Sequence, residues 1–392
     1  MSNTNKSRPV DPIVELMNAY NSDQRVDKIN LGIGVYQDEN GAVPIFSAVK
    51  SAEKKLLETQ MTKTYVGVGG DPEFVKLITN KVFGETAKNF SGIQTIGGSG
   101  ALRVIGDAIR EGWGASTIWV SNPTWPNHHA LFEACGHTMK SYEYPLYDDV
   151  DIVDNLIASL SEAKAGDFII FHACCHNPTG IDLSDDQWTQ LTTFCASKGI
   201  IPIFDAAYIG FHSGFDSDAQ KLARACQGFD FGFCAFSCSK NFGLYRERAG
   251  AALVYSNEDS QKEQIKASFL TIARASYSMP PDHGAAIVAG ILDNDEMASS
   301  WIDELEQARV RINSLRVLLA THLENLSFPF SVEYLKNGHG LFALLPLSPE
   351  QTYWLRSDAG IYMMPSGRIN IAGINTDNVS RLAEKCVSAC NI

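Results

Sequence analysis

The sequence predicts an α/β fold: a large domain with a mostly parallel central sheet sandwiched by helices, and a smaller α+β domain. From about residue 95, helical patterns alternate with short β-rich runs, which is typical of βαβ units. These runs are nearly continuous in apolar residues, as expected for strands buried on both faces. With 392 residues, of which 45% are hydrophobic, the chain can bury a large core in about two to three domains' worth of material.

Four apolar runs are predicted to form strands of the central sheet. They are TIWV, DFIIFHACC, GIIPIFD and GFCAFSC, at residues 117–120, 167–175, 199–205 and 232–238. Residues 182–199 indicate a helix between two of these strands, because Asp and Ser stand at its start and Gly199 provides a stop. The alternation of strand and helix supports the α/β class.

A long helix is expected over residues 299–326, where apolar side chains recur at steps of three and four. Ser300 and Asp303 form the expected capping box at its start. After this helix come the strand-like runs FALLPL and RINIAGI and a terminal helix in TDNVSRLAEKCVSAC. These elements indicate the smaller α+β domain.

The composition argues against several functional classes. The 45 acidic and 32 basic residues give a formal charge of −13, which repels nucleic acids and anionic membrane surfaces. No apolar stretch approaches the ~20 residues that a membrane span requires, and the N-terminus lacks the features of a signal or transit peptide. The nine cysteines show no regular disulfide spacing. We therefore expect a cytoplasmic protein with reduced thiols that binds neither nucleic acid nor membrane.

Chemically active side chains follow the predicted strands at the points where the strands end. In an open, mostly parallel sheet, ligands bind outside the carboxyl ends of the strands. These ends supply an aromatic plane, an amide, a carboxylate, a phenol and an amine, which we expect to converge on one crevice. The residues are Trp125, His128, Asn177, Asp205, Tyr208, Ser237, Ser239 and Lys240.

A glycine-rich turn precedes a helical pattern in TIGGSGALRVIGDAIR. Gly97, Gly98, Ser99 and Gly100 stand where backbone N–H groups at a helix start can bind a phosphate, aided by the helix dipole. Such a motif alone is more often only a turn. The strand ends described above favour the phosphate-binding interpretation.

Lys240 directly follows an apolar strand, which predicts a reactive amine. A lysine in such surroundings loses its proton more easily than a solvated one and can attack a carbonyl to form a Schiff base. If that carbonyl belongs to pyridoxal phosphate, Asp205 would keep the pyridine nitrogen protonated, so that the ring withdraws electrons. The other groups would then bind the ring (Trp125), its hydroxyl oxygen (Tyr208 and Asn177) and the phosphate (Ser237, Ser99 and Arg248).

Ordinary structural roles stay open for these residues when each is taken alone. A lysine after a strand is usually solvated, Asp205 could cap the next helix, and Trp125 and Tyr208 could be core aromatics. The cluster HACCH at residues 172–176 holds four potential metal ligands, but strand alternation sends neighbours to opposite faces, and no second ligand pair with zinc-like spacing is found. We expect structural packing there and no metal site.

A series of motifs runs in order along essentially the whole chain: INLGIGVYQDENG, TKTYVGVGG, GGSGALR, SNPTWPNH, CCHNPTG, FDAAYIGF, SKNFGLYRERAG, YSMPPDHGA and SGRINIAG. Together they resemble the aspartate aminotransferase group of the class I, fold-type-I pyridoxal-phosphate enzymes, including close relatives active on aromatic amino acids. The resemblance implies pyridoxal 5′-phosphate as cofactor, amino acids and 2-oxo acids as substrates, and a homodimer with shared active sites. It also implies an N-terminal arm (1–12), a small domain (13–44 and 306–392) and a large cofactor-binding domain (45–305).

Position by position, the resemblance assigns catalytic and cofactor-binding roles. Lys240 becomes the lysine that forms the Schiff base, and Asp205 becomes the partner of the pyridine nitrogen, with His128 behind it. Tyr208 is the third residue with a catalytic role. Gly98 and the phosphate ligands given above hold the cofactor, together with a tyrosine, Tyr65, from the partner subunit.

The same resemblance implies a set of substrate-binding residues. Gly34 lies beside the bound substrate, with Trp125 and Asn177 in contact with it. Arg368 would bind the substrate α-carboxylate, and Arg274 would reach into the active site of the partner subunit. Two guanidinium groups match the two carboxylates of aspartate, glutamate and 2-oxoglutarate.

Three positions that line the substrate side-chain pocket in this family are apolar or small here: Val43, Ser99 and Met279. Relatives with such residues also accept phenylalanine, tyrosine or tryptophan. We therefore expect ping-pong transamination of both aspartate and aromatic amino acids, with 2-oxoglutarate as acceptor. The alternatives are an enzyme dedicated to one of these classes, a β-lyase or decarboxylase on the same scaffold, and a non-catalytic ligand-sensing regulator.

Overall fold

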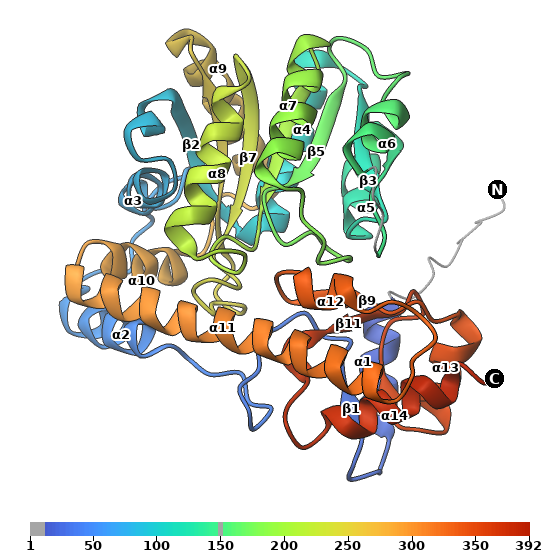
Figure 1. Ribbon diagram of the computed structural model, residues 1–392. Helices are drawn as coiled ribbons and strands as arrows, with labels where there is room; N and C mark the ends of the chain where they lie inside the picture. Colours follow the sequence, from blue (N-terminus) through green and yellow to red (C-terminus); the bar gives the residue numbers. More distant parts are fainter. Residues whose placement is uncertain (1–11, 148–151) are drawn as a thin grey trace, which may run out of the picture.

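The computed structural model describes residues 12–147 and 152–392 and contains a central sheet of seven strands (Figure 1). Their order is β2-β8-β7-β6-β5-β3-β4. β8 is antiparallel to both of its neighbours, and the other neighbouring pairs are parallel. The bounds are Phe90–Ile96 (β2), Thr117–Asn122 (β3), Thr138–Glu143 (β4), Phe168–His172 (β5), Ile201–Ala206 (β6), Phe231–Ser237 (β7) and Ala249–Ser256 (β8). The predicted mostly parallel sheet is confirmed, and the four predicted strands are β3, β5, β6 and β7.

The sheet is buried on both faces because its apolar side chains alternate between two helical layers. Along β5, Phe168 and Ile170 belong to a core with α4, α5 and α9, whereas Ile169 and Phe171 belong to the core that includes α3, α6, α7 and α8. These helices span Pro72–Phe83 (α3), Gly97–Trp113 (α4), Asn127–Ala134 (α5), Ile152–Ser159 (α6), Asp185–Ser197 (α7), Phe215–Gln227 (α8) and Asp259–Ser276 (α9), and a 3₁₀ helix, η1, spans Gly84–Asn89. The α/β class is therefore confirmed.

Two helices begin at residues whose side chains cap them, one within a predicted helix and one before the predicted start. α7 begins after Ser184, whose side chain and that of Gln187 form a capping box, within the helix expected at residues 182–199. The long helix α11 (Asp295–Asn325) begins earlier than expected, because Asn294 caps it by accepting a hydrogen bond from the backbone of Met297. The capping box predicted at Ser300 and Asp303 is therefore wrong, since both residues lie inside the helix.

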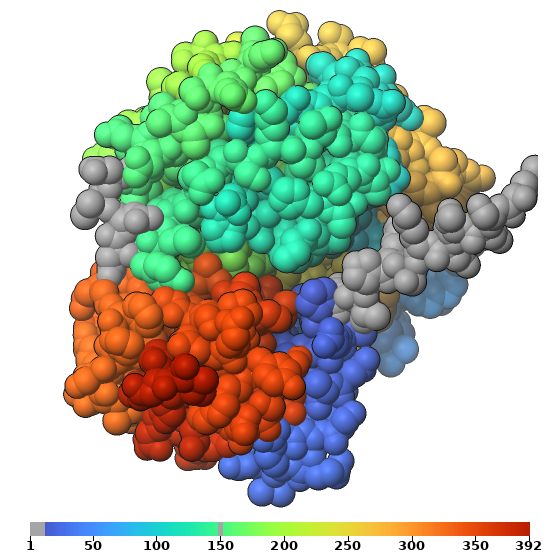
Figure 2. Space-filling model, turned by 90° about the vertical axis from the view of Figure 1, so that its right-hand side faces the viewer, coloured from blue at the N-terminus to red at the C-terminus, as the bar shows by residue number. Residues whose placement is uncertain are grey.

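Elements from the early and the late part of the chain form a second body (Figure 1). Figure 2 shows the early residues (blue) and the late residues (orange and red) together in the lower half of the molecule, beneath the residues from the middle of the sequence (teal and green). β1 pairs in parallel with β10, and β9 is antiparallel to β11. The bounds are Pro12–Ser22 (α1), Ile29–Asn30 (β1), Glu333–Asn337 (α12), Phe342–Leu344 (β9), Pro349–Ser357 (α13), Ile361–Tyr362 (β10), Arg368–Asn370 (β11), Ile371–Gly373 (η2) and Val379–Ala389 (α14).

α11 runs beneath the sheet from one side of the molecule to the other (Figure 1). It contacts α2 (Ser47–Thr59) and α10 (Asp282–Leu292), and it also contacts α12 and α14. The domain boundary predicted between residues 305 and 306 falls within this helix and stays a prediction. The predicted N-terminal arm, 1–12, lies outside the described residues except for its last position.

Two further findings concern the class of protein. Within residues 12–147 and 152–392, no helix is long and apolar enough to cross a membrane. The nine cysteines are free, and all but Cys390 are buried. Burial raises the pKa of Cys195 and Cys386 to about 12, so these thiols stay protonated near neutral pH.

Candidate active site

A cavity of about 200 Å³ opens at the carboxyl ends of β5, β6 and β7, between the sheet and the second body. The sheet side contributes the strand-end residues and the start of α4, and the second body contributes residues near β1 and β11. The predicted site residues that line the cavity are Gly34, Gly98, Ser99, Trp125, Asn177, Asp205, Tyr208, Ser237, Lys240, Arg248 and Arg368. The strand ends therefore do converge on one crevice.

His128 lies behind the cavity wall, where it holds the carboxylate of Asp205. Nε2 of His128 is 3.1 Å from Oδ2 of Asp205, and its Nδ1 is 2.9 Å from the hydroxyl of Thr124. Burial acts to raise the pKa of Asp205, but the hydrogen bond from His128, together with nearby positive charge, lowers this pKa on balance. The cavity thus keeps a buried, ionised carboxylate in its floor.

Lys240 projects into the cavity over the face of Tyr208. Its Nζ lies 5.0 Å from the centroid of the Tyr208 ring. Burial lowers the pKa of Lys240; Asp205 opposes this shift, and the positive charges of Arg248 and Arg368 add to it. A lysine with a lowered pKa is more often neutral, and a neutral amine is both a nucleophile and a base.

A phenol and an amide lie close to this amine. Nδ2 of Asn177 is 3.4 Å from the hydroxyl oxygen of Tyr208, and burial raises the pKa of Tyr208. The side-chain oxygen Oδ1 of Asn177 is buried and has no hydrogen-bond partner among the described residues. A buried polar atom of this kind costs free energy unless a ligand satisfies it.

An anion site is formed where α4 begins. Nη1 of Arg248 donates a hydrogen bond to the hydroxyl of Ser239 at 3.2 Å. A Cβ atom at Gly97, where φ is +63°, would lie 2.7 Å from the Arg248 guanidinium, and one at Gly98 would lie 2.9 Å from Cβ of Ser237. Only glycine lets the helix start approach these side chains so closely. Backbone N–H groups, two hydroxyls and a guanidinium therefore surround one small space.

The opposite wall of the cavity carries a second guanidinium. Nη2 of Arg368 donates to the backbone oxygen of Gly32 at 3.0 Å, and its guanidinium lies 4.5 Å from the centroid of the Phe342 ring. A Cβ at Gly34 would lie 2.7 Å from Cζ of Phe342. Glycine at position 34 therefore leaves room for the ring that supports Arg368, which can face a ligand carboxylate.

Several predicted residues do not line this cavity within a single chain. Tyr65 is 89% exposed, and Arg274 is exposed near the end of α9, where its Nη1 lies 2.6 Å from the hydroxyl of Ser278. Val43 is also exposed, and Met279 is half-buried away from the cavity. The contribution of Tyr65 and Arg274 to the partner subunit's site, and the place of Val43 and Met279 in the substrate side-chain pocket, stay predictions.

The cavity is also lined by residues that were not predicted to lie there from the sequence, among them His172, Ala207 and Phe342. His172 was expected only to pack within HACCH, but it ends β5 in register with Asp205. Burial lowers its pKa to about 4, so it is neutral. Ser239, expected at this crevice from its position after β7, does line the cavity, whereas nothing local in the sequence places Phe342 at the site.

Comparisons with known proteins identify the family. The chain matches the family described as aminotransferase class I and II over residues 26–385. It is 42% identical to a tyrosine aminotransferase of Rhizobium meliloti, covering 96% of this chain and 97% of the relative. The chain belongs to the class I and II aminotransferases.

Two more similarities of this aminotransferase bear on its site. It is 40% identical to an aspartate aminotransferase of Escherichia coli, covering 97% of this chain and 98% of the relative. A crystal structure of an aromatic-amino-acid aminotransferase from Burkholderia pseudomallei, covalently bound to pyridoxal phosphate, superposes with a TM-score of 0.92 at 32% identity. That alignment covers 99% of this chain and 100% of the other. The aminotransferase described here is accordingly a pyridoxal-phosphate enzyme.

The residues of the aminotransferase cavity fit that cofactor. The glycine-lined start of α4 with Arg248 suits a phosphate, and the buried carboxylate of Asp205 suits a protonated pyridine nitrogen. Asn177, whose Nδ2 is a hydrogen-bond donor beside the hydroxyl of Tyr208, and the amine of Lys240 line the space between these two ends. Each charged part of the cofactor thus has a complementary group in the cavity wall.

Proposed function

We propose that this aminotransferase transfers the amino group of aspartate and of aromatic amino acids to 2-oxoglutarate by a ping-pong mechanism. The observation that carries the proposal is the cavity itself, in which Lys240 and Asp205 on the sheet side face Arg368 on the second body. An amine of lowered pKa, a fixed carboxylate and a carboxylate-binding guanidinium are the groups that such a transfer requires.

Lys240 is the proposed attachment point of the cofactor and the group that moves the proton. When bound, pyridoxal phosphate supplies an electron-withdrawing ring that stabilises the charge developing at the substrate Cα. The free amine of Lys240 would act as the base that takes the proton from the substrate Cα, since burial lowers its pKa. Asp205, oriented by His128, holds the positive charge of the ring nitrogen.

Other residues orient the reacting groups. Arg368 would bind the α-carboxylate of the substrate, with Gly34 beside it, and so orient Cα toward Lys240. Asn177 and Tyr208 would bind the ring hydroxyl oxygen, and Trp125 would pack against the ring. In this scheme Ser99, Ser237 and Arg248 anchor the phosphate, together with the backbone of Gly98.

The proposed enzyme is a cytoplasmic homodimer in which each active site is completed by the neighbour. Exposed Tyr65 and Arg274 would then reach the phosphate and the second substrate carboxylate of the partner subunit's site. We assign residues 45–305 to the large domain, with the rest of the chain in the small domain and the arm. Sedimentation velocity of the holoenzyme tests the assembly, and a monomer that retains full activity contradicts it.

Dual specificity is supported by two observations. Relatives of nearly equal identity are named tyrosine aminotransferase and aspartate aminotransferase. Of the three positions that predicted aromatic substrates, Ser99 lines the cavity, whereas Val43 and Met279 would act only across the proposed dimer. An arginine that binds a carboxylate, beside apolar surface, can serve both a dicarboxylate and an aromatic side chain.

Specificity constants test this proposal. The purified holoenzyme is assayed with aspartate, phenylalanine and tyrosine as donors and 2-oxoglutarate as acceptor, and kcat/KM is determined for each. Measurable transfer from both classes is expected, with glutamate as the product. Turnover of one class alone would mean a dedicated enzyme, and release of pyruvate and ammonia in place of an exchanged amino group would mean a β-lyase.

A further inference from the structure

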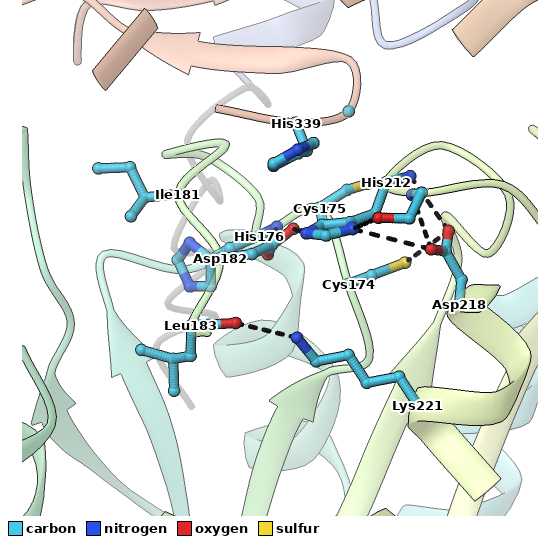
Figure 3. Close-up of polar contacts among 12 residues, drawn as sticks. Cys174, Cys175, His176, Ile181, Asp182, Leu183, His212, Asp218, Lys221 and His339 are labelled. Atoms are coloured by element: carbon cyan, nitrogen blue, oxygen red, sulfur yellow. Dashed lines mark hydrogen bonds and ion pairs between the residues drawn. The ribbon is translucent and has the colours of Figure 1, made fainter. Parts of the chain in front are cut away.

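A cluster of three potential metal ligands lies outside the active site, at the contact between the two bodies. Asp182 follows β5, His212 follows β6, and His339 precedes β9. One ligand atom from each lies within 4.8 Å of those of the other two. Figure 3 shows His339 reaching from the second body toward His212 and Asp182 on the loops of the sheet. The HACCH cluster considered from the sequence is a different set of residues.

The three side chains are close together without satisfying one another. Nε2 of His212 is 3.7 Å from Oδ2 of Asp182, which is longer than a hydrogen bond. The rings of His212 and His339 are stacked, with centroids 3.9 Å apart. Nδ1 of His339 is buried and has no hydrogen-bond partner among the described residues. Because imidazole lone pairs lie in the ring plane, the two stacked rings do not point their nitrogens at one common position as they stand. A turn of the His339 ring, whose Nδ1 has no hydrogen-bond partner among the described residues, would bring a nitrogen toward Nε2 of His212 and the carboxylate of Asp182.

Other contacts hold these ligands in place, as metal ligands in proteins usually are. The carboxylate of Asp182 accepts hydrogen bonds from the backbone N–H groups of Cys175 and His176, at 2.7 and 3.0 Å. Nδ1 of His212 is 2.6 Å from the hydroxyl of Ser213, which leaves its Nε2 for another ligand. Asp182 and His212 would therefore lose little freedom on binding an ion.

The loops that carry the ligands are also fixed. Asp218 accepts hydrogen bonds from the backbone of Gly210, His212 and Ser213, as the dashed lines of Figure 3 show in part. The backbone N–H of His339 donates to the oxygen of Gly180 at 2.7 Å. The three loops thus meet in a defined geometry, which lowers the entropy cost of binding an ion.

We propose that Asp182, His212 and His339 form a binding site for a divalent transition-metal ion of the Zn²⁺ type, which links the two bodies beside the active site. Imidazole nitrogen with one carboxylate oxygen is a donor set that suits Zn²⁺. At metal–ligand distances of about 2.0–2.2 Å, two ligands of a tetrahedral ion lie about 3.3 Å apart. The present spacing of 3.7 Å between Asp182 and His212 needs only a small adjustment to reach this value.

Direct binding tests the proposal and is independent of the proposed substrates. ZnCl₂ is titrated into the holoenzyme by calorimetry in a buffer without chelator or thiol. In the holoenzyme the cofactor engages Asp205, so the other candidate group, His128, His172 and Asp205, does not compete. One saturable site per chain is expected, with a melting temperature that rises with zinc concentration and returns after addition of EDTA.

Variants locate the site. His339→Ala and, as a second variant, His212→Gln should each weaken zinc binding by at least about tenfold, because each removes one of three ligands. Asp182 is left intact, since its carboxylate also holds two backbone N–H groups. His283→Ala is the matched control, because His283 is a half-exposed histidine on α10 outside the cluster, and it should leave binding unchanged.

Anomalous scattering of a zinc-soaked holoenzyme crystal completes the test. A peak between the three side chains is expected. A peak at any other place, or zinc affinity that is the same in wild type, His339→Ala and His212→Gln, overturns the proposal.

Discussion

The charge states of single residues are set by burial and by near neighbours. Lys240 has a lowered pKa because it is buried, yet Asp205 in the same cavity keeps its charge because His128 donates to it. In the proposed mechanism these two groups have different tasks: Lys240 moves a proton and Asp205 holds a charge. The side chains around the cavity therefore set the protonation states of Lys240 and Asp205.

Replacement of Lys240 with Ala tests the role of the amine. We expect kcat with either donor to fall by about 10³-fold or more, because the proton carrier and attachment point are both lost. The measurement is steady-state transfer to 2-oxoglutarate, with Lys76→Ala as a control at an exposed lysine on α3. A variant that retains near-normal turnover would refute the assignment of Lys240.

The pKa of His172 predicts how stability changes with pH. Burial lowers this pKa to about 4, from an ordinary value of 6.5, so the unfolded chain binds a proton more readily than the folded one. The contribution of neutral His172 to the free energy of unfolding is complete above pH 6.5 and is lost as the pH falls toward 4. The total loss is about 3 kcal/mol. Urea unfolding at several pH values measures it. In His172→Gln the dependence should be shallower; identical curves would contradict the prediction.

At the scale of elements, the strands could be predicted well because burial on both faces makes them apolar and their ends polar. The start of α11 could not be placed in the same way. The apolar periodicity becomes clear only from Trp301, so Ser300 and Asp303 looked like the natural cap, whereas the helix extends further back to Asn294. Periodicity reports which residues face a core, and the first turn of α11 is set by its cap instead.

The cap of α11 gives a stability prediction with a built-in control. Asn294→Ala should lower the free energy of unfolding by about 1 kcal/mol, because the backbone N–H of Met297 loses its acceptor. Ser300→Ala, at the position first predicted to be the cap, should change it by only about 0.5 kcal/mol or less. Denaturant unfolding of both variants checks this. A larger loss at Ser300 than at Asn294 would go against the observed helix start.

For the molecule as a whole, the sheet side of the active site could be predicted from the sequence, but the opposite wall could not. Asp205, Asn177 and Lys240 follow strands of one parallel sheet, so their convergence is a consequence of topology. Phe342 and Arg368 reach the cavity only through the packing of the second body, which no local pattern specifies. Arg368 was assigned by resemblance alone, and Phe342 was missed.

Substrate selection across the proposed dimer yields a prediction at this scale. Arg274→Leu should reduce kcat/KM for aspartate by about 10–100-fold, because a charge-assisted pair with the second carboxylate is lost. It should change kcat/KM for phenylalanine far less, since phenylalanine has no second carboxylate. Arg224→Leu, at another exposed arginine, serves as the control. Equal losses of kcat/KM for the two donors would show that Arg274 does not determine substrate specificity.

The pairing of β1 with β10 has a consequence for biosynthesis. Ile29 and Ile361 are in register, so the segment of β1 must wait until the much later segment of β10 has been translated. The central sheet, whose strands lie between residues 90 and 256, can assemble while translation continues. Arg368, which lines the cavity, is also translated late, and a nascent chain therefore cannot form the complete active site before the segment that carries Arg368 has left the ribosome.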